Sequence, residues 1–262
     1  MKMIRIERLE QELEGLRSQW NSADPFPHVI IDNFLTPEAA EILDGAFPNP
    51  SKTKVNKSRD YMFAKNKFEK SGFRNISADT EALYQELLDP RLAKLIAGIT
   101  GKEIFVDPSF HGGGMHISGE GSFLDMHVDF NMHPVEKKWH RHLNLLLYMN
   151  KGWEDTWGGK LKIRHRDGSK TTEVAPIFNR AVLMVTNEIS VHGFSPIHFP
   201  EDRYRKSFAI YCYYQDGTQK KPRVTRWYPE KGGRIKKVLG YYWPTIVRIK
   251  SKFLGSSTKK NQ

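Results

Sequence analysis

The chain has 262 residues, of which 39% are hydrophobic and 27% charged, and its formal net charge is +11 at pH 7. This length predicts one full-sized domain with extensions. No apolar run approaches the roughly 20 residues of a membrane span, and the first seven residues lack the apolar centre of a signal peptide. The single cysteine, Cys212, excludes an intramolecular disulfide, so we expect a cytoplasmic protein without a transmembrane segment.

The excess positive charge lies in the last part of the chain. Residues 219–262 hold 13 Lys or Arg residues and one acid, a net charge of +12, whereas the other residues hold 28 bases and 29 acids, a net charge of −1. The charge therefore describes a basic C-terminal extension and not the whole protein.

Three elements are predicted before residue 50. Apolar residues recur at spacings of three and four within residues 5–20, which indicates an amphipathic helix. Residues 28–35 predict a strand. Residues 36–46 predict a second helix, with Thr36 as its N-cap and Pro37 at its first position.

The next segment, residues 51–74, is polar and rich in lysine. We expect a solvated loop here, and the sharper alternative is a mobile lid over an anionic substrate.

Two further helices, at residues 77–88 and 89–99, are followed by short strands from residue 103 onward, separated by turns such as residues 166–169. This order predicts an α+β protein whose core is a double-stranded β-helix, the cupin-like jelly roll, braced by N-terminal helices. The predicted organisation has three parts, which are the support region 1–102, the core 103–217 and the basic extension 218–262.

A metal site is indicated by His127 and Asp129. Residues two apart on a strand point to the same face, so both can bind one ion. Such a pair also arises by chance, and it needs a third ligand from a neighbouring strand, for which His192 fits. Two imidazoles and one carboxylate form the facial triad that suits non-haem Fe(II).

An anion site is indicated further along the chain. Arg205 and Ser207 share one face of a predicted strand. The arginine fork binds a carboxylate with two parallel hydrogen bonds, and the hydroxyl adds another donor. This pair suits a small dicarboxylate.

These residues belong to a longer series of motifs. The series comprises Gly112-Gly-Gly-Met-His-Ile, His127-Val-Asp129-Phe-Asn131, Arg141-His-Leu-Asn144-Leu-Leu-Leu-Tyr148-Met-Asn150, Trp157-Gly-Gly159-Lys-Leu161, His192-Gly and Arg205-Lys-Ser207. In this order they resemble the Fe(II)- and 2-oxoglutarate-dependent oxygenases, in their prolyl-4-hydroxylase-like branch. The resemblance implies Fe(II) as the metal and 2-oxoglutarate and O2 as cosubstrates, and it makes ascorbate a candidate addition.

The resemblance also implies roles for individual residues. His127, Asp129 and His192 would hold the metal, and Arg205 the far carboxylate of 2-oxoglutarate. The other cosubstrate contacts would come from Ser207, Tyr148, Asn144 and Asn131, with Leu146 and Leu161 as walls of the pocket. The carboxylate of Asp129 favours hydroxylation over halogenation, and His116 and His133 are candidates for the substrate side.

The expected function is therefore hydroxylation of an unactivated C–H bond with release of succinate and CO2. The substrate stays open between a prolyl residue in a peptide, a free amino acid and a sugar or carrier-linked intermediate. One alternative is a catalytically silent jelly-roll binding protein whose basic tail docks an anionic partner. Another is a zinc hydrolase, which would need a general base and no dicarboxylate site.

Three interpretations of the basic tail compete. It forms a helix packed on its own domain, it lies on anionic lipid, or it contacts nucleic acid. Nucleic acid is the least favoured because no nucleic-acid-binding motif is present. Packing is favoured because Trp243, Ile246, Val247, Phe253 and Leu254 recur near helical spacing.

Overall fold

The computed structural model describes residues 2–51, 56–57, 60–199, 203–218 and 221–254, apart from the side chains of Asn56 and residues 248–254. The helices are α1 (Ile6–Gln11), α2 (Leu13–Ser22), α3 (Pro37–Gly45), α4 (Ala78–Leu87), α5 (Pro90–Thr100) and α6 (Gly233–Leu254), with short 3-10 helices η1 (Phe73–Asn75) and η2 (Asp155–Trp157). The strands are β1 (His28–Ile31), β2 (Asn56–Lys57), β3 (Ala64–Lys70), β4 (Phe105–Val106), β5 (Gly114–Val128), β6 (His140–Tyr148), β7 (Leu161–His165), β8 (Thr171–Val174), β9 (Arg180–Val185), β10 (Ser190–Phe194), β11 (Arg205–Tyr214) and β12 (Arg226–Trp227).

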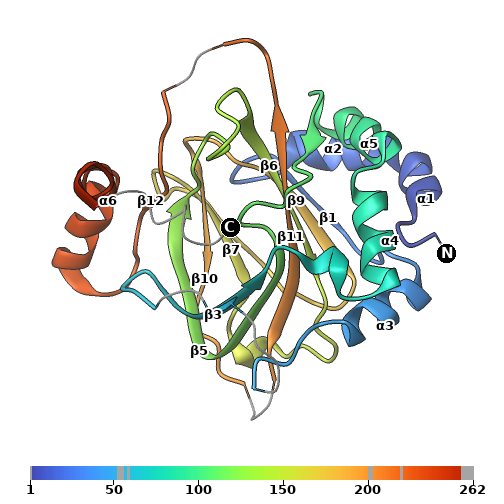
Figure 1. Ribbon diagram of the computed structural model, residues 1–262, viewed down its shortest axis with the longest axis horizontal. Coiled ribbons are helices and arrows are strands. Elements are labelled where there is room, and N and C mark those ends of the chain that lie inside the picture. The colour runs from blue at the N-terminus through green and yellow to red at the C-terminus, as the bar shows by residue number, and fades with distance from the viewer. Residues whose placement is uncertain (1, 52–55, 58–59, 200–202, 219–220, 255–262) are drawn as a thin grey trace.

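The strands form one curled sheet, as Figure 1 shows. Eight of them follow the order β1-β9-β6-β11-β5-β10-β7-β8, while β3 and β12 also pair with β5, β4 pairs with β11, and β2 pairs with β3. The pairings described are antiparallel. This is the arrangement that the sequence predicted for the core. Strands from all three predicted segments, 1–102, 103–217 and 218–262, share the sheet.

The long strand β5 connects the two halves of the curled sheet. Its first part pairs with β11, where Met115 lies opposite Phe208. Its last part pairs with β10, where His127 lies opposite His192. The strand therefore brings residues from distant parts of the chain to its C-terminal end.

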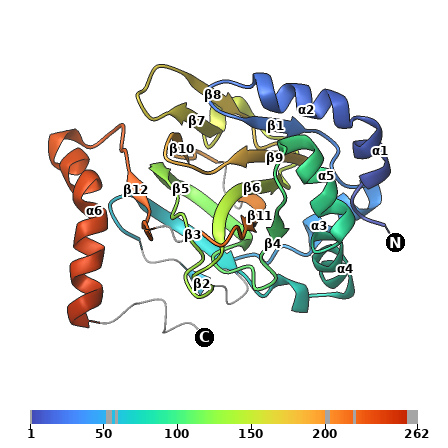
Figure 2. The same cartoon turned by 90° about the horizontal axis from the view of Figure 1, so that it is seen from above.

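The N-terminal helices α1, α2, α4 and α5 lie together on one side of the sheet, as Figures 1 and 2 show. Their apolar faces bury Leu16 and Trp20 of α2 and Leu95 and Ile96 of α5 in the main core. Burying a side chain of this size contributes about 1.5–3 kcal/mol. This packing is the predicted bracing of the sheet by helices.

Local capping explains where these helices begin. Thr36 accepts a hydrogen bond from the Ala39 N–H, Ser77 forms a capping box with Thr80, and Asp89 accepts from the Arg91 N–H. The predicted helices at 36–46, 77–88 and 89–99 are confirmed, within a residue or two at their ends. The predicted helix at 5–20 is interrupted at Glu12, where one helix ends and the next begins.

Two sequence predictions in the N-terminal region are wrong in part. The strand predicted at 28–35 ends at Ile31, because the chain turns at Asn33, which has a positive φ of 51°. The loop predicted at 51–74 contains β3, which pairs with β5. The strand was missed because β3, which pairs edge to edge with β5, consists largely of half-exposed Lys, Asn and Glu residues and lacks the apolar alternation of a buried strand.

The basic extension continues the sheet and then forms α6. Strand β12 pairs with the end of β5, where Trp227 lies opposite His127. Helix α6 contacts the domain through Trp243, whose ring stacks on Tyr61 at a centroid distance of 5.9 Å. The predicted packing of the tail on its own domain is confirmed at this residue. Ile246, also predicted to pack, is exposed, and the side chains of Phe253 and Leu254 lie outside the described part of the chain.

Within the part of the chain that the structure describes, no helix combines the length and apolar character needed to cross a bilayer.

Candidate metal centre

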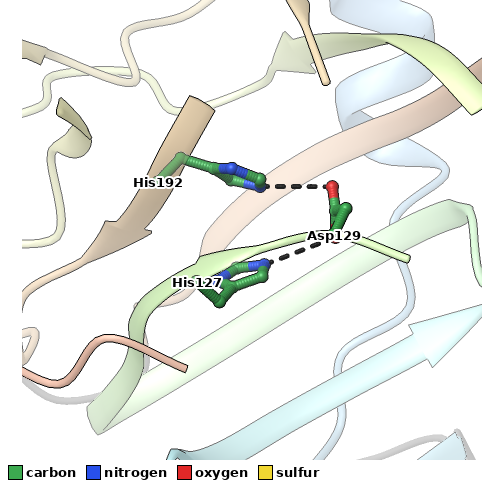
Figure 3. A group of neighbouring side chains, drawn as sticks. All are labelled: His127, Asp129 and His192. Carbon is green, nitrogen blue, oxygen red and sulfur yellow. Dashed lines mark ion pairs between the residues drawn. The ribbon is translucent and has the colours of Figure 1, made fainter. Parts of the chain in front are cut away.

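The three predicted metal ligands meet at one point, as Figure 3 shows. His127 lies near the end of β5, Asp129 directly follows that strand, and His192 lies on β10. The Nε2 atom of His127 lies 3.5 Å from Oδ1 of Asp129, and the Nε2 atom of His192 lies 3.3 Å from Oδ2. The three ligand atoms lie within 4.8 Å of one another, and no other such group occurs among the described residues.

The orientation of both imidazoles fits a divalent cation. The Nδ1 atom of His127 lies 2.9 Å from the Asp125 carbonyl, and Nδ1 of His192 lies 3.3 Å from the Ser190 carbonyl. Because a carbonyl only accepts hydrogen bonds, this contact assigns the proton of the neutral ring to Nδ1 and leaves a lone pair on Nε2. Burial and the neighbouring His192 lower the pKa of His127, which favours the neutral ring. Two lone pairs then face a carboxylate, and a metal ion between them would remove the repulsion.

The chain holds Asp129 as a carboxylate by further contacts. Arg141 Nη2 lies 2.9 Å from Oδ2 of Asp129, and Asn144 Nδ2 donates to the same oxygen at 2.9 Å. Burial alone would raise the pKa of Asp129, but the Arg141 guanidinium keeps it well below its usual range. These contacts orient one oxygen of the ligand, as outer-shell residues do in metal sites.

Arg141 is a site residue to which sequence reasoning gave no role. Asn144 and Tyr148 line the cavity from β6, and strict alternation would place His142 on the same face. The pairing of β6 with β11 shifts between Cys212 and Tyr213, which lie opposite Leu143 and Arg141. This irregularity skips His142 and turns Arg141 into the cavity. No pattern in the sequence marks the shift.

The ligands line a cavity of about 210 Å³. The predicted residues that line it are His127, Asp129, His192, Arg205, Ser207, Tyr148, Asn144, Leu146, Leu161 and His116. The curled sheet therefore brings together nearly all the side chains that the motifs indicated.

Asn131 and His133 are the exceptions among the predicted site residues. The Asn131 side chain accepts a hydrogen bond from the Arg223 N–H and donates to the Lys221 carbonyl, so it fastens the C-terminal extension and does not line the cavity. His133 is buried beside Asp107, with its Nε2 atom 3.3 Å from a carboxylate oxygen. Asn131 therefore satisfies backbone groups and does not make the predicted cosubstrate contact, and His133 does not line the cavity as predicted.

Arg205 is a buried cation suited to bind an anion. Its Nε donates to the Gly159 carbonyl at 2.9 Å, and its Nη2 donates to the Tyr148 hydroxyl at 3.3 Å. Its guanidinium also lies over the ring of Phe194. No carboxylate among the described residues forms an ion pair with it, whereas Arg141 is paired with Asp129. A buried charge without a counterion is costly, so an anionic ligand beside Arg205 would relieve that cost.

Segments outside the core motifs close the cavity. Tyr61 and Lys67 line it from the N-terminal side, and Thr225 and Trp227 from the C-terminal extension. The Trp227 ring lies 4.9 Å from the His127 ring, measured between centroids. The sequence predicted only packing or docking for the extension, so the contribution of Thr225 and Trp227 to the cavity wall was not predicted.

The close approach of β10 to β5 leads to a testable prediction at Gly193. A Cβ atom there would lie 2.5 Å from the Leu124 carbonyl oxygen and 2.9 Å from backbone atoms of Asp125. Because backbone cannot yield as a flexible side chain does, we expect Gly193→Ala to destabilise the protein by about 1–3 kcal/mol in urea unfolding. Gly45→Ala is the matched control, since its Cβ would meet nothing within 4 Å. Equal stability of the two variants would contradict the tight contact beside His192.

Comparison with known proteins defines the class of this site. Residues 113–213 match the family model of the 2OG-Fe(II) oxygenase superfamily. This region contains the three ligands and Arg205, and its match agrees with the resemblance that the motifs indicated. No curated protein matches the chain by sequence.

Solved structures with this fold include prolyl hydroxylases. A prolyl hydroxylase from Trichoplax adhaerens, in complex with a hypoxia inducible factor peptide fragment, has 17% identity and a TM-score of 0.58, covering 80% of this chain and 92% of that one. A Pseudomonas putida prolyl-4-hydroxylase has 16% identity and a TM-score of 0.53, covering 78% and 98%. The α-ketoglutarate-dependent epimerase SnoN from nogalamycin biosynthesis has 11% identity and a TM-score of 0.51, covering 78% and 83%. The jelly-roll prediction is confirmed, and the same fold also carries a different reaction.

Proposed function

We propose that this chain is an Fe(II)- and 2-oxoglutarate-dependent dioxygenase that hydroxylates an unactivated C–H bond. The observation that carries the proposal is the combination, in one cavity, of the His127-Asp129-His192 group with the buried cation Arg205, which has no ion-pair partner in the described part of the chain. The first fits a divalent metal and the second fits the free carboxylate of a dicarboxylate cosubstrate. A cytoplasmic location remains part of the proposal.

The metal ligands and their supports have separate tasks. His127, Asp129 and His192 hold Fe(II), which when bound lets O2 oxidise 2-oxoglutarate to succinate and CO2 while the substrate C–H bond becomes C–OH. Arg141 and Asn144 hold Asp129 by its Oδ2 atom. The ligand geometry is thereby preorganised before the cosubstrate arrives.

The far carboxylate of 2-oxoglutarate binds at the Arg205 end of the cavity. Tyr148 accepts a hydrogen bond from Arg205, so the hydroxyl proton of Tyr148 is free to be donated to the ligand. Ser207 lies opposite Tyr148 in the pairing of β11 with β6 and lines the same cavity. A charged fork and two hydroxyls supply the donors that a carboxylate requires.

A peptide containing proline is the substrate class to test first. The fold relatives include two prolyl hydroxylases, one of them solved with a peptide fragment. Free amino acids, sugars and carrier-linked intermediates remain in the screen because the epimerase relative has the same fold.

Neither alternative function is favoured by a specific observation. A silent binding protein would have no need of the complete ligand group. A zinc hydrolase would need a general base, and Asp129 is the only carboxylate among the described residues that line the cavity.

The deciding experiment measures succinate formed from 2-oxoglutarate under air with Fe(II) and ascorbate, with and without proline-containing peptides. We expect succinate from the wild-type protein and none above background from His127→Ala, which lacks one metal ligand. Calorimetry of 2-oxoglutarate binding without oxygen, with and without Fe(II), gives a second measurement that does not depend on turnover.

The two measurements separate the outcomes. Fe(II)-dependent binding without succinate would support the site and leave the substrate to be found. Neither succinate nor Fe(II)-dependent binding would overturn the proposal and favour the silent binding protein.

A further inference from the structure

Helix α6 carries an exposed apolar surface that the proposed oxygenase reaction does not use. Five of the ten exposed large hydrophobic side chains among the described residues belong to this one helix. They are Ile235, Val238, Tyr241, Tyr242 and Ile246. Ile235 is 78% exposed, and Val238 and Tyr242 are each 55% exposed. A concentration of this kind marks an interaction surface.

The exposed residues form one continuous stripe along the helix. Ile235, Val238, Tyr242 and Ile246 are separated by three, four and four residues, the spacing that aligns side chains on one face of an α-helix. We call these four residues the apolar stripe of α6. The exposed Arg234 borders the stripe, whereas Lys237 lies on another face of the helix, where it lines a pocket with Trp227 and Tyr228.

A different face of α6 is fixed to the domain. Lys236 forms an ion pair with Asp125 at 2.6 Å, and the Trp243 ring packs against the rings of Tyr61 and Phe63. The helix also approaches β12 closely, because a Cβ atom on Gly240 would lie 2.8 Å from the Trp227 carbonyl oxygen. These contacts hold the helix in one orientation and leave the apolar stripe uncovered.

The position of α6 keeps the stripe accessible. Figures 1 and 2 show α6 at the end of the molecule opposite the N-terminal helices α1, α2 and α5. An amphipathic helix at such an edge can lie on a flat surface without displacing the rest of the domain.

The charge of the extension selects the occupant. Residues 219–262 have a net charge of +12, so two copies of this chain would repel each other at this face. Nucleic acid would match the charge but offers no partner to aliphatic side chains such as Ile235 and Val238. An anionic lipid surface offers phosphate groups to the bases and an apolar interior to the stripe, and tyrosine is favoured at its interface.

We propose that α6 docks this protein peripherally on an anionic lipid membrane, with the apolar stripe inserted and Arg234 at the headgroups. The docking is independent of the proposed oxygenase activity, because none of these residues lines the metal cavity. The binding energy comes from apolar burial and from charge attraction together, so both must be tested.

The test is sedimentation of the full chain with phosphatidylcholine vesicles that contain phosphatidylserine, compared with phosphatidylcholine vesicles alone. We expect binding only to the anionic vesicles and weaker binding as salt rises. Ile235→Ser with Tyr242→Ser should weaken binding at least about tenfold, since both apolar contacts are lost without a change of charge. Ile42→Ser is the matched control because Ile42 is 41% exposed on α3.

A second pair of variants tests the charge contribution. Arg234→Gln should weaken binding about fivefold, at about 1 kcal/mol per basic residue near the surface. Arg17→Gln with Lys94→Gln removes two exposed bases from α2 and α5 and should leave binding unchanged. Thermal melting followed by circular dichroism checks that each variant is folded.

Three results would overturn the proposal. One is the absence of binding to anionic vesicles, and another is unchanged binding by both α6 variants. The third is evidence that the stripe binds a different partner. A dimer in analytical ultracentrifugation that Ile235→Ser with Tyr242→Ser dissociates would assign the stripe to a second copy of the chain. Binding to polyglutamate without binding to vesicles would assign it to an acidic polypeptide.

Discussion

Replacing Asp129 with alanine is expected to abolish Fe(II)-dependent formation of succinate from 2-oxoglutarate. The substitution removes one of three ligand side chains and leaves Arg141 buried without its carboxylate partner. Changes in residues that only support a metal ligand reduce affinity or activity about 10–100-fold, so losing the ligand itself should exceed that range. Turnover and metal-dependent thermal stabilisation should therefore be lost together, because an ion that binds only the folded protein raises its melting temperature.

The control for this variant is Asp125, a carboxylate four residues earlier, on β5. Asp125→Asn alters a side chain that pairs with Lys236 and keeps the backbone carbonyl that faces Nδ1 of His127. We expect it to keep both the turnover and the stabilisation by Fe(II). Stabilisation of Asp129→Ala by Fe(II) equal to that of the wild type would remove Asp129 from the metal site, whatever its turnover.

The metal group could be predicted from the sequence because its parts obey simple periodicities. His127 and Asp129 are two residues apart at the end of a strand, and the pleat alone brings them to one side. His192 could be chosen because of its motif, and the antiparallel pairing of β10 with β5 places it directly opposite His127. Arg205 and Ser207 followed the same alternation on β11.

The features that could not be predicted depend on departures from the two-residue alternation of a strand and on pairing between distant segments. Arg141 reaches Asp129 only because the register of β6 shifts at His142. Strand β3 has no apolar pattern of its own, and its extended structure comes from pairing along β5. Trp227 reaches His127 through the two-residue strand β12, which is too short to have a periodicity.

The prediction that Ile246 of the tail packs on the domain was wrong for a related reason. Helical spacing correctly indicated that α6 is amphipathic, but it does not say which face meets the domain. Trp243 packs on Tyr61, while Ile246, three residues later, is exposed. The aromatic contacts of Tyr61, Phe63 and Trp227 decide the orientation of the helix. These residues come from segments whose contact no local sequence pattern predicts.

Arg205→Ala is expected to raise the 2-oxoglutarate concentration needed for turnover while changing the iron requirement little. A hydrogen bond to a charged group contributes about 1.5–3 kcal/mol, which corresponds to roughly a 10- to 150-fold increase in that concentration. Arg205→Lys should recover only part of the loss, because lysine keeps the charge but cannot form the two parallel bonds of the arginine fork.

The matched control is Arg203→Ala, since Arg203 is exposed over the Trp157 ring and does not line the metal cavity. The cosubstrate requirement should be measured by succinate formation, and Fe(II) affinity separately by calorimetry without oxygen. If Arg205→Ala and Arg203→Ala need the same 2-oxoglutarate concentration as the wild type, the far carboxylate does not bind at Arg205. Arg141 is then the remaining buried arginine in the cavity, and because it already pairs with Asp129, an anion there would compete with the metal ligand for the same guanidinium. That competition would appear as a coupled change in the iron and 2-oxoglutarate requirements, which the Arg205 assignment does not predict.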